Sequence, residues 1–282
     1  MKIKSILLTV FAASVLAVGF APANVLVIYN GGTTLGHFTD AGTLIQNIAT
    51  NLVGSSAVTT DSSGNVYVGT GGQVRMYNIA TGNFVRDILP GGYTTVSGLT
   101  FNPANPIQLI VLASYGDNSQ LGIWSTGSTG SSVTALNGLG NGYTGLYYTD
   151  AIRDVAGQAI YAGTTAAGGL IQAFNSSTLA HIGNARDRLG TTGGVTGTAS
   201  NLFYVSSSGG HVENQTLGAN IITGLKDPRG IASDGATLWL AQTGNDAVGH
   251  YNVAGGLIGS FRLTGPTAIA YAETKDTKRS SK

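Results

Sequence analysis

The chain contains no cysteine and few charged residues. Of its 282 residues 10% are charged, four are His, and the two glutamates are Glu213 and Glu273. Without cysteine there can be no disulfide bond, no thiolate metal site and no thiol nucleophile. The folded protein therefore depends on an apolar core for its stability, and a chain of this length can bury one.

Positively and negatively charged residues are nearly equal in number. The 14 Lys and Arg residues nearly balance the 13 Asp and Glu residues. Proteins that bind nucleic acid or anionic lipid carry an excess of positive charge over one surface. The balance therefore argues against a nucleic-acid partner and against a charged membrane surface.

The N-terminal residues have the pattern of an export signal. Lys2 and Lys4 precede an apolar stretch that ends at Phe20, and Ala21-Pro22-Ala23 has the small-x-small pattern of a cleavage site. We expect a cleaved signal peptide over residues 1–23 and a secreted or periplasmic protein. No other stretch approaches the ~18 apolar residues of a membrane span, so no stable membrane insertion is expected.

Glycine, in contrast, is abundant, and it separates copies of one repeated pattern. The 43 Gly residues cluster between strand-like runs, as the turns of an all-β protein require. Each copy has a small residue with Val, Leu or Ile, a turn, a β-branched or aromatic strand, a Gly-rich loop and a further strand. The first apolar residues of the six copies, 36 to 49 residues apart, are Val58, Leu99, Leu146, Val195, Ile231 and Ile269.

A period of ~40 residues is typical of a four-stranded β-propeller blade. We therefore predict an all-β fold, a six-bladed β-propeller of four-stranded antiparallel blades, over residues 24–273. A seven-bladed or irregular propeller is the alternative. Residues 274–282 are polar, without apolar periodicity, and are expected to form a disordered tail.

The two ends of the repeat region complement each other. The first copy lacks an inner strand, because Asn24 opens directly onto the strand that runs to Tyr29, whereas the last copy has one in excess, Thr267 to Tyr271. We predict that this C-terminal strand pairs with the N-terminal blade. Such pairing closes the ring and leaves no exposed edge at the seam.

The third strand of most copies ends in an aromatic residue followed by a turn-forming one. These pairs are Phe38-Thr39, Tyr77-Asn78, Trp124-Ser125, Phe174-Asn175 and Tyr251-Asn252. We expect the ring to pack between blades and the following side chain to bond its own backbone. In the fifth copy Glu213 is expected to stand in place of the ring, either because that blade is weak or because it holds a carboxylate site.

Two stretches resemble NHL or YVTN-type propeller repeats. One is residues 227–248, with Asp227-Pro228-Arg229-Gly230-Ile231 followed by Leu238-Trp239-Leu240, and the other is residues 61–78. The resemblance covers the body of the chain and implies the propeller fold. It implies little about function, because such propellers serve as enzymes, receptors and scaffolds.

Propeller enzymes need residues that the expected positions lack. Gluconolactonase-like propellers hold a divalent metal with a Glu and several Asn or Asp side chains from inner strands, whereas the predicted inner strands carry no carboxylate. These predicted strands are Ser55–Thr60, Val96–Phe101, Thr144–Tyr148, Gly194–Ala199, Arg229–Ser233 and Thr267–Tyr271. Streptogramin-lyase-like propellers place a His where this chain has Arg229, so the general base is missing.

No catalytic residue, metal site or cofactor is therefore predicted. The four histidines, on predicted outer or third strands, are expected to lie at the surface or at blade edges: His37, His181, His211 and His250. Four polar residues between first and second strands are expected to cap turns: Asp61, Asn102, Asp150 and Asp234.

One face of the propeller remains as a candidate binding surface. The loops that precede the inner strands and the loops between second and third strands should meet at the channel mouth. The candidate binding residues there are Tyr93, Asn118, Asn141, Tyr143, Asp227, Arg229 and Asn245, with Tyr115, Asp117 and Asp246 beside them. Tyr, Asn and Arg suit contact with a protein or a saccharide better than bond cleavage, although Asp227 and Arg229 are also close enough in sequence to pair with each other.

The predicted function is that of an exported, non-catalytic binding or scaffold protein. A propeller enzyme, either a lyase or a lactonase-like hydrolase, is the first alternative. A structural protein of the cell surface or matrix is the second, because the chain is rich in uncharged Gly, Thr, Ser and Asn.

Overall fold

The computed structural model describes most of the chain between residues 24 and 272. The described residues are 24–89, 92–102, 105–115, 118–125, 134–136, 148–153, 159–164, 170–175, 178, 180–186, 190–198 and 200–272. They form 24 β-strands, and the helical structure among them is a 3-10 turn, η2 (Thr243–Asn245). In this part of the chain no helix is long and apolar enough to cross a membrane.

The described strands form six four-stranded antiparallel sheets, numbered here as blades 1 to 6. Blade 1 holds β24 (Ala268–Ala272), β1 (Asn24–Tyr29), β2 (Thr34–Thr39) and β3 (Leu44–Ala49). Blade 2 holds β4 (Ala57–Thr60), β5 (Asn65–Thr70), β6 (Gln73–Asn78) and β7 (Phe84–Leu89). Blade 3 holds β8 (Thr95–Asn102), β9 (Asn105–Tyr115), β10 (Asn118–Ser125) and β11 (Thr134–Leu136).

The other three blades follow in the same order along the chain. Blade 4 holds β12 (Tyr148–Arg153), β13 (Ala159–Thr164), β14 (Leu170–Asn175) and β15 (His181–Arg186). Blade 5 holds β16 (Thr192–Gly197), β17 (Leu202–Ser206), β18 (His211–Asn214) and β19 (Ala219–Ile222). Blade 6 holds β20 (Pro228–Ser233), β21 (Thr237–Gln242), β22 (Ala247–Asn252) and β23 (Leu257–Arg262).

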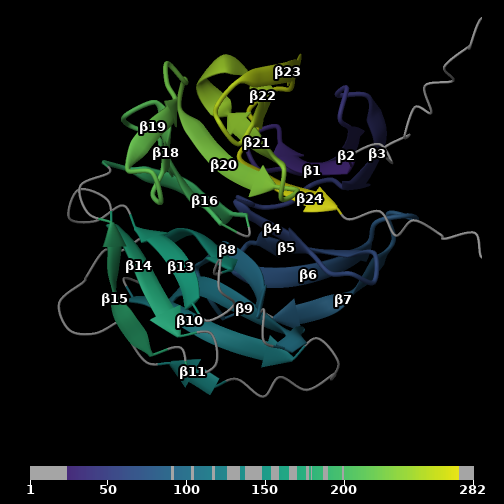
Figure 1. Ribbon diagram of the computed structural model, residues 1–282. Helices are drawn as coiled ribbons and strands as arrows, with labels where there is room; N and C mark the ends of the chain where they lie inside the picture. The colour runs from purple at the N-terminus through teal and green to yellow at the C-terminus, as the bar shows by residue number, and fades with distance from the viewer. Residues whose placement is uncertain are drawn as a thin grey trace, which may run out of the picture.

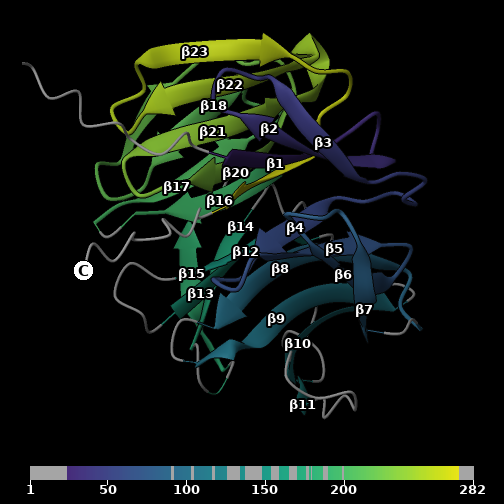
Figure 2. The same ribbon diagram turned by 90° about the vertical axis from the view of Figure 1, so that its right-hand side faces the viewer.

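The innermost strands of neighbouring blades contact each other in a closed circuit. The order of contacts is β24, β4, β8, β12, β16, β20 and back to β24. Figure 1 shows these strands in the middle of the molecule, with β3, β7, β11, β15, β19 and β23 at its periphery, and Figure 2 shows the same blades after a turn of 90°. The fold is therefore a β-propeller with four-stranded antiparallel blades.

The C-terminal strand closes the ring, as predicted. β24 pairs with β1 over five residue pairs, from Asn24 opposite Ala272 to Ile28 opposite Ala268. Beyond the ladder, the backbone N–H of Asn30 donates to the carbonyl oxygen of Thr264 at 2.8 Å. The first blade therefore consists of three N-terminal strands and one C-terminal strand.

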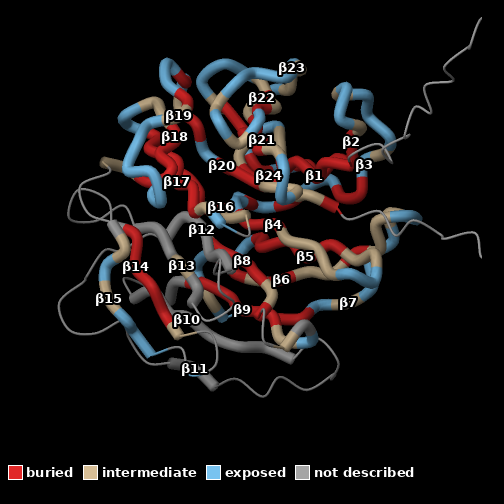
Figure 3. Tube along the Cα trace, in the orientation of Figure 1, coloured by how far each residue is buried: buried red, intermediate tan, exposed pale blue. Residues whose placement is uncertain are grey.

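Apolar clusters between neighbouring blades form the core. Phe38 lies in the cluster between blades 6 and 1, Tyr77 in that between blades 1 and 2, and Tyr251 in that between blades 5 and 6. Figure 3 shows burial concentrated on the inner and middle strands, with exposed residues along β3, β7, β19 and β23. The predicted role of the third-strand rings is confirmed for these three residues.

In blades 2 and 6 the residue after the ring also does what the pattern predicted. The Asn78 side-chain oxygen accepts hydrogen bonds from the backbone N–H and the hydroxyl of Thr81, at 3.0 and 3.1 Å. Asn252 accepts from the backbone N–H groups of Ala254 and Gly256, both at 2.9 Å. Because these bonds satisfy the backbone of the turn locally, they start it directly after the strand.

The predicted inner strand of the fourth blade was wrong. Of the predicted range 144–148, residues 144–147, including Leu146, lie outside the described residues, and β12 begins at Tyr148. In the other described blades the first apolar residue of each copy lies opposite the second strand, as Val58 lies opposite Val68. In blade 4 Ala151 takes that place, opposite Ala162. Ala151, and not Leu146, is therefore the residue that anchors the fourth copy.

The predicted position of Glu213 was also wrong. Val195, the first apolar residue of the fifth copy, lies opposite Tyr204, and Tyr204 lies opposite Glu213. In blade 6 the corresponding residue Ile231 lies opposite Leu240, and Leu240 lies opposite Gly249, two residues before the ring of Tyr251. Glu213 therefore occupies the position of Gly249, and it is 4% exposed.

Candidate functional site

Two kinds of loop lie together at one end of the propeller. Leading loops run into the innermost strands, and middle loops join the second and third strands of a blade. Because successive strands of a blade are antiparallel, both kinds of loop occur at the same end. We call this end the channel mouth.

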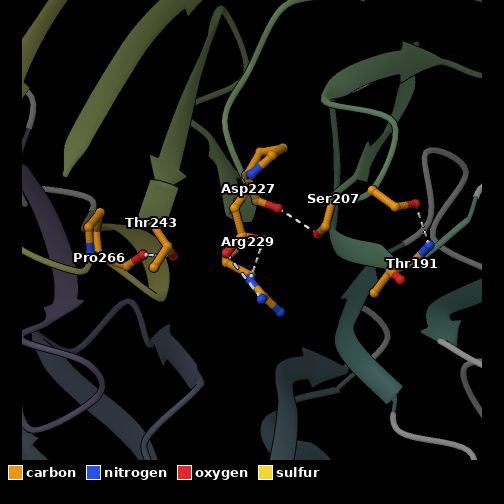
Figure 4. Close-up of polar contacts among 8 residues, drawn as sticks. Thr191, Ser207, Asp227, Arg229, Thr243 and Pro266 are labelled. Carbon is orange, nitrogen blue, oxygen red and sulfur yellow. Dashed lines mark hydrogen bonds and ion pairs between the residues drawn. The ribbon is translucent and has the colours of Figure 1, made fainter. Parts of the chain in front are cut away.

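The middle loop of blade 6 joins two neighbouring leading loops. Its Thr243 N–H donates to the carbonyl oxygen of Asp227, in the leading loop of the same blade, at 3.1 Å. The Thr243 hydroxyl donates to the carbonyl oxygen of Pro266, in the leading loop of blade 1, at 2.7 Å (Figure 4). The loop therefore bridges blades 6 and 1 at the mouth.

Blade 5 repeats this arrangement. The Ser207 N–H donates to the carbonyl oxygen of Thr191 at 2.7 Å, and the Thr191 N–H donates to the Ser208 hydroxyl at 3.0 Å. The Ser207 hydroxyl donates to the carbonyl oxygen of Pro228, in blade 6, at 2.6 Å (Figure 4). The same hydroxyl-to-carbonyl contact thus links blade 5 to blade 6 and blade 6 to blade 1.

Backbone hydrogen bonds continue the connection through blade 1. The Gly31 N–H donates to the carbonyl oxygen of Gly265, and the Ser55 N–H donates to that of Gly32, both at 3.1 Å. The Thr267 hydroxyl donates to the carbonyl oxygen of Ser55 at 3.2 Å. From blade 5 to blade 2 the mouth is therefore a bonded rim, which holds the side chains that it carries in defined positions.

A β-bulge lies at this end of four innermost strands. Between Pro228 and Ile231 of β20 the register shifts, so Arg229 and Gly230 together oppose one residue, Ala241. Equivalent shifts lie between Val96 and Gly98 in β8, Tyr148 and Ala151 in β12, and Thr192 and Val195 in β16. Bulges redirect side chains and are common beside functional sites. At the position of Arg229 the other three strands have Ser97, Thr149 and Gly193, so this blade alone has a cation there.

Arg229 is bound side-on by Asp227. Its Nε lies 2.9 Å from one carboxylate oxygen of Asp227, and its Nη2 donates to the other at 3.1 Å. The two side chains are 48% and 39% exposed, so this pair adds under ~1 kcal/mol to stability. Figure 4 shows one terminal nitrogen of Arg229 bonded to Asp227 and the other directed away from it. The ion pair therefore fixes the guanidinium and leaves its end accessible.

Left-handed backbone is concentrated at the mouth. Among the described residues four non-glycine residues have positive φ, namely Asn30 (52°), Asn51 (59°), Asp227 (42°) and Asp246 (49°). All four lie in leading or middle loops. Asn and Asp tolerate this conformation better than other side chains, and such positions often occur at functional sites. The mouth of blades 6, 1 and 2 is thus the conformationally constrained end of the propeller.

Charge differs between the two ends. Within the described residues the mouth of blade 6 carries the cations Lys226, Arg229 and Arg262 with the carboxylates Asp227 and Asp246. The opposite end carries Asp40, Asp61 and Asp234 in its described turns, and Arg153 ends β12 there. The mouth is therefore the more positive end.

The structure places the predicted site residues unevenly. It brings Asp227, Arg229 and Asn245 to the same place, because Asn245 ends η2 and η2 contacts β20. The Asn245 side chain donates to that of Gln242, at the end of β21, at 3.2 Å. Tyr93 is half-buried and packs against the core of blades 2 and 3, so it offers less surface than expected. Asn118 begins β10 opposite Tyr115, at the same end. Asn141 and Tyr143, with Asp117, lie outside the described residues.

The expected turn caps are confirmed at Asp61 and Asp234 and wrong at Asp150. Asp61 accepts from the backbone N–H groups of Ser63 and Asn65, at 2.8 and 2.9 Å. Asp234 accepts from those of Ala236 and Thr237, at 2.8 and 2.6 Å. Asn102 ends β8 and its side-chain amide donates to that of Gln108 at 2.9 Å, and its role as a turn cap stays a prediction.

Asp150 lies within the inner strand β12, at the bulge position of Gly230 in β20. The prediction that no inner strand carries a carboxylate was therefore wrong. A single carboxylate does not make an oxygen cage for a metal ion. Among the described residues no three His, Asp or Glu side chains are close enough to hold one.

The histidines are less exposed than predicted. His37 is 9% exposed, opposite Leu26, and neither of its ring nitrogens has a hydrogen-bond partner. Burial lowers the pKa of His37. His250 stacks on Trp239 with ring centroids 3.8 Å apart, and its Nε2 lies 2.9 Å from the Thr237 hydroxyl. Burial also lowers the pKa of His250, although Asp234 and Asp40 oppose that shift. His181, in contrast, is exposed as expected.

Sequence reasoning missed the hydroxyl groups that build the rim. Thr243 and Ser207 follow the second strands of their blades, and Thr70 ends that of blade 2, where it bonds the N–H of Val53 at 2.8 Å. The signal was present as a Ser or Thr recurring after the second strand. The partners of Thr243 and Ser207 are carbonyl oxygens of the next blade, and a repeat pattern does not identify these.

Comparison with known proteins shows the fold. The sequence matches no protein-family model and no curated protein. The structure is similar to a chain of the crystal structure of a nidogen/laminin complex, with a TM-score of 0.74 and 14% identity over 89% of this chain and 98% of that one. It is also similar to a protein of unknown function from Bacteroides caccae, with a TM-score of 0.69 and 9% identity over 90% of this chain and 100% of that one.

A computationally designed protein, Ika8, matches with a TM-score of 0.51 and 14% identity over 87% of this chain and 74% of that one. At these identities the matches concern architecture alone. The chain thus has the β-propeller fold, and its function has to be argued from the channel mouth.

Proposed function

We propose that this protein is an exported, six-bladed propeller that binds a protein partner at its channel mouth. Residues 1–23 act as the signal peptide, residues 24–273 form the propeller, residues 274–282 form a polar tail, and the protein is secreted or periplasmic. The six four-stranded sheets of the described residues and their closed circuit of inner strands support the number of blades.

The observation that carries the binding role is the Asp227–Arg229 pair on the bulge of β20. It places an accessible, oriented cation on a hydrogen-bonded rim. Arginine is enriched at interface positions that contribute strongly to affinity. A rigid rim lowers the entropy lost on association, because its loops are already ordered.

The similar chain from the nidogen/laminin complex supports a protein partner. That structure is of two proteins in complex, and the matched chain has the same fold over 98% of its length. The fold alone does not choose a partner, so the proposal depends on the residues at the mouth. The candidate contact residues are Tyr93, Asn118, Asn141, Tyr143, Asp227, Arg229 and Asn245.

Selection of binding peptides from a phage-displayed library of random 12-residue sequences tests this proposal. Synthetic versions of the selected peptides are titrated against the wild-type protein and against a variant with Arg229→Ala and Asn245→Ala. We expect the double change to weaken binding at least ten-fold and to leave the melting temperature within ~2 °C, because both side chains are exposed.

A matched pair of changes on the outer blade surface, Arg86→Ala and His181→Ala, is the control, and it should leave affinity unchanged. Binding that survives the change at the mouth and is lost in the control would move the site to the propeller rim. Selection of glycans but of no peptide on a glycan array would favour the saccharide alternative.

A further inference from the structure

We propose that the partner presents a carboxylate side chain, Asp or Glu, to the free end of the Arg229 guanidinium at the channel mouth. This inference rests on the proposed binding role of the mouth and names the chemistry of the partner. The occupant is an acidic segment of a protein, with one carboxylate seated on Arg229.

The geometry of the ion pair leaves the second binding edge of the guanidinium open. A guanidinium has five N–H groups, and Asp227 takes those of Nε and one of Nη2. Asp227 is the polar partner of Arg229 among the described residues. Three N–H groups remain, two on Nη1 and one on Nη2. One N–H of Nη1 and the remaining N–H of Nη2 form a fork that matches the two oxygens of a carboxylate.

Asp227 makes Arg229 a prepared site. Its left-handed backbone, at φ 42°, and the hydrogen bond from Thr243 to its carbonyl oxygen hold it in place. An arginine that is already fixed loses less side-chain entropy when it binds a second carboxylate. Asp227 also offsets part of the positive charge of Arg229. The site therefore favours a carboxylate that matches the geometry of the guanidinium over anions that are attracted by charge alone.

Charge around Arg229 suits an approaching carboxylate. Lys226 and Arg262 lie on the same end of blade 6. The three cations outnumber Asp227 and Asp246, whereas the described turns of the opposite end carry Asp residues and Arg153 ends β12 there. Electrostatic steering would therefore turn the mouth toward an acidic partner.

The described surface favours a protein over an acidic saccharide. Saccharides are bound by rings that stack on sugar faces together with amide side chains. Two rings at this end whose side chains the structure describes are held by other contacts: Tyr93 packs against the core of blades 2 and 3, and Tyr29 packs edge-on against Phe38 and donates its hydroxyl to Asn47. A carboxylate fork needs no such platform.

The test uses the synthetic peptides selected on the channel mouth. Each Asp or Glu of a peptide is replaced singly by Asn or Gln, and the C-terminus is amidated. Affinity is measured by calorimetry for the wild-type protein, for Arg229→Gln and for Arg262→Gln. Arg262 is the matched control, because it lies at the same end and donates to the carbonyl oxygen of Asn245 at 2.7 Å.

We expect one peptide carboxylate whose neutralisation weakens binding about ten-fold or more on the wild-type protein, as loss of a charged hydrogen-bonded pair does. On Arg229→Gln the same replacement should change affinity less than two-fold, whereas on Arg262→Gln the ten-fold effect should remain. Coupling to Arg262 in place of Arg229, or equal affinity for all amide versions, would overturn the inference.

The outcomes separate this inference from the proposed function. Peptides that depend on the mouth but on no carboxylate would refute the inference alone. An uronate-containing tetrasaccharide that depends on Arg229, while no peptide binds, would keep the carboxylate and refute the protein as its source. Failure of every probe to depend on the mouth would refute the proposed function and this inference with it.

Discussion

The C-terminal strand should account for a large part of the stability of the ring. The perturbation is a chain that ends at Thr264 and so lacks β24, compared with a chain that ends at Glu273 and keeps it. In the structure β24 forms five residue pairs with β1 and contacts the inner strands β4 and β20 of both neighbouring blades. Its removal opens the seam at which the ring closes.

The magnitude follows from what β24 buries. Ile269 is 5% exposed, and Ala268, Ala270 and Ala272 are buried as well. Burial of an Ile side chain contributes about 1.5–3 kcal/mol and each methyl group about 0.8 kcal/mol, so the strand contributes roughly 4–5 kcal/mol before its hydrogen bonds are counted. Proteins of this kind have about 5–15 kcal/mol of stability in all. The shorter chain should therefore be marginal or unfolded.

Thermal unfolding followed by circular dichroism measures the difference. A point variant keeps the test informative if the shorter chain does not fold: Ile269→Ala should cost about 2–5 kcal/mol, with a shift of roughly 2–4 °C for each kcal/mol. Ile258→Ala, on the outermost strand β23 where the side chain is 54% exposed, is the control. Equal midpoints for the two truncations and for the two point variants would refute the claim that β24 closes the ring.

Other predictions concern the buried histidine, the rim and one glycine. Because burial lowers the pKa of His37 in the folded protein, the unfolded chain binds more protons below pH ~6.5. Stability should therefore fall as the pH drops below that value. In His37→Leu the denaturation midpoint should depend less on pH between pH 7 and 5 than in the wild-type protein. Ser207→Ala removes the bond to the carbonyl oxygen of Pro228 and should cost about 1 kcal/mol in urea unfolding, where no change would show that the rim bond is dispensable. Gly72→Ala should cost more, with a lower melting temperature, because Gly72 has φ 75° and a Cβ atom would overlap the carbonyl oxygen of Tyr93.

The repeat spacing, the strand positions and the ring closure could be predicted from the sequence because their signals are local. A β-branched or aromatic run between glycines defines a strand, and a period of ~40 residues defines a blade. The missing strand before Asn24 and the surplus one at Ile269 predicted the pairing that β24 and β1 make. Capping by Asp61 and Asn78 was predictable for the same reason, since each bonds its own turn.

Tertiary structure decided the features that depend on register and on contacts between blades. Glu213 stands two residues from the position predicted for it, and Ala151 takes the place predicted for Leu146, because the register of a strand depends on its pairing partner as well as on its own hydrophobic pattern. The accessible end of Arg229 could not be read from the chain, because the spacing of Asp227 and Arg229 permits a pair without showing which edge of the guanidinium it uses. Only the bulge of β20 and the bonded rim decide that orientation.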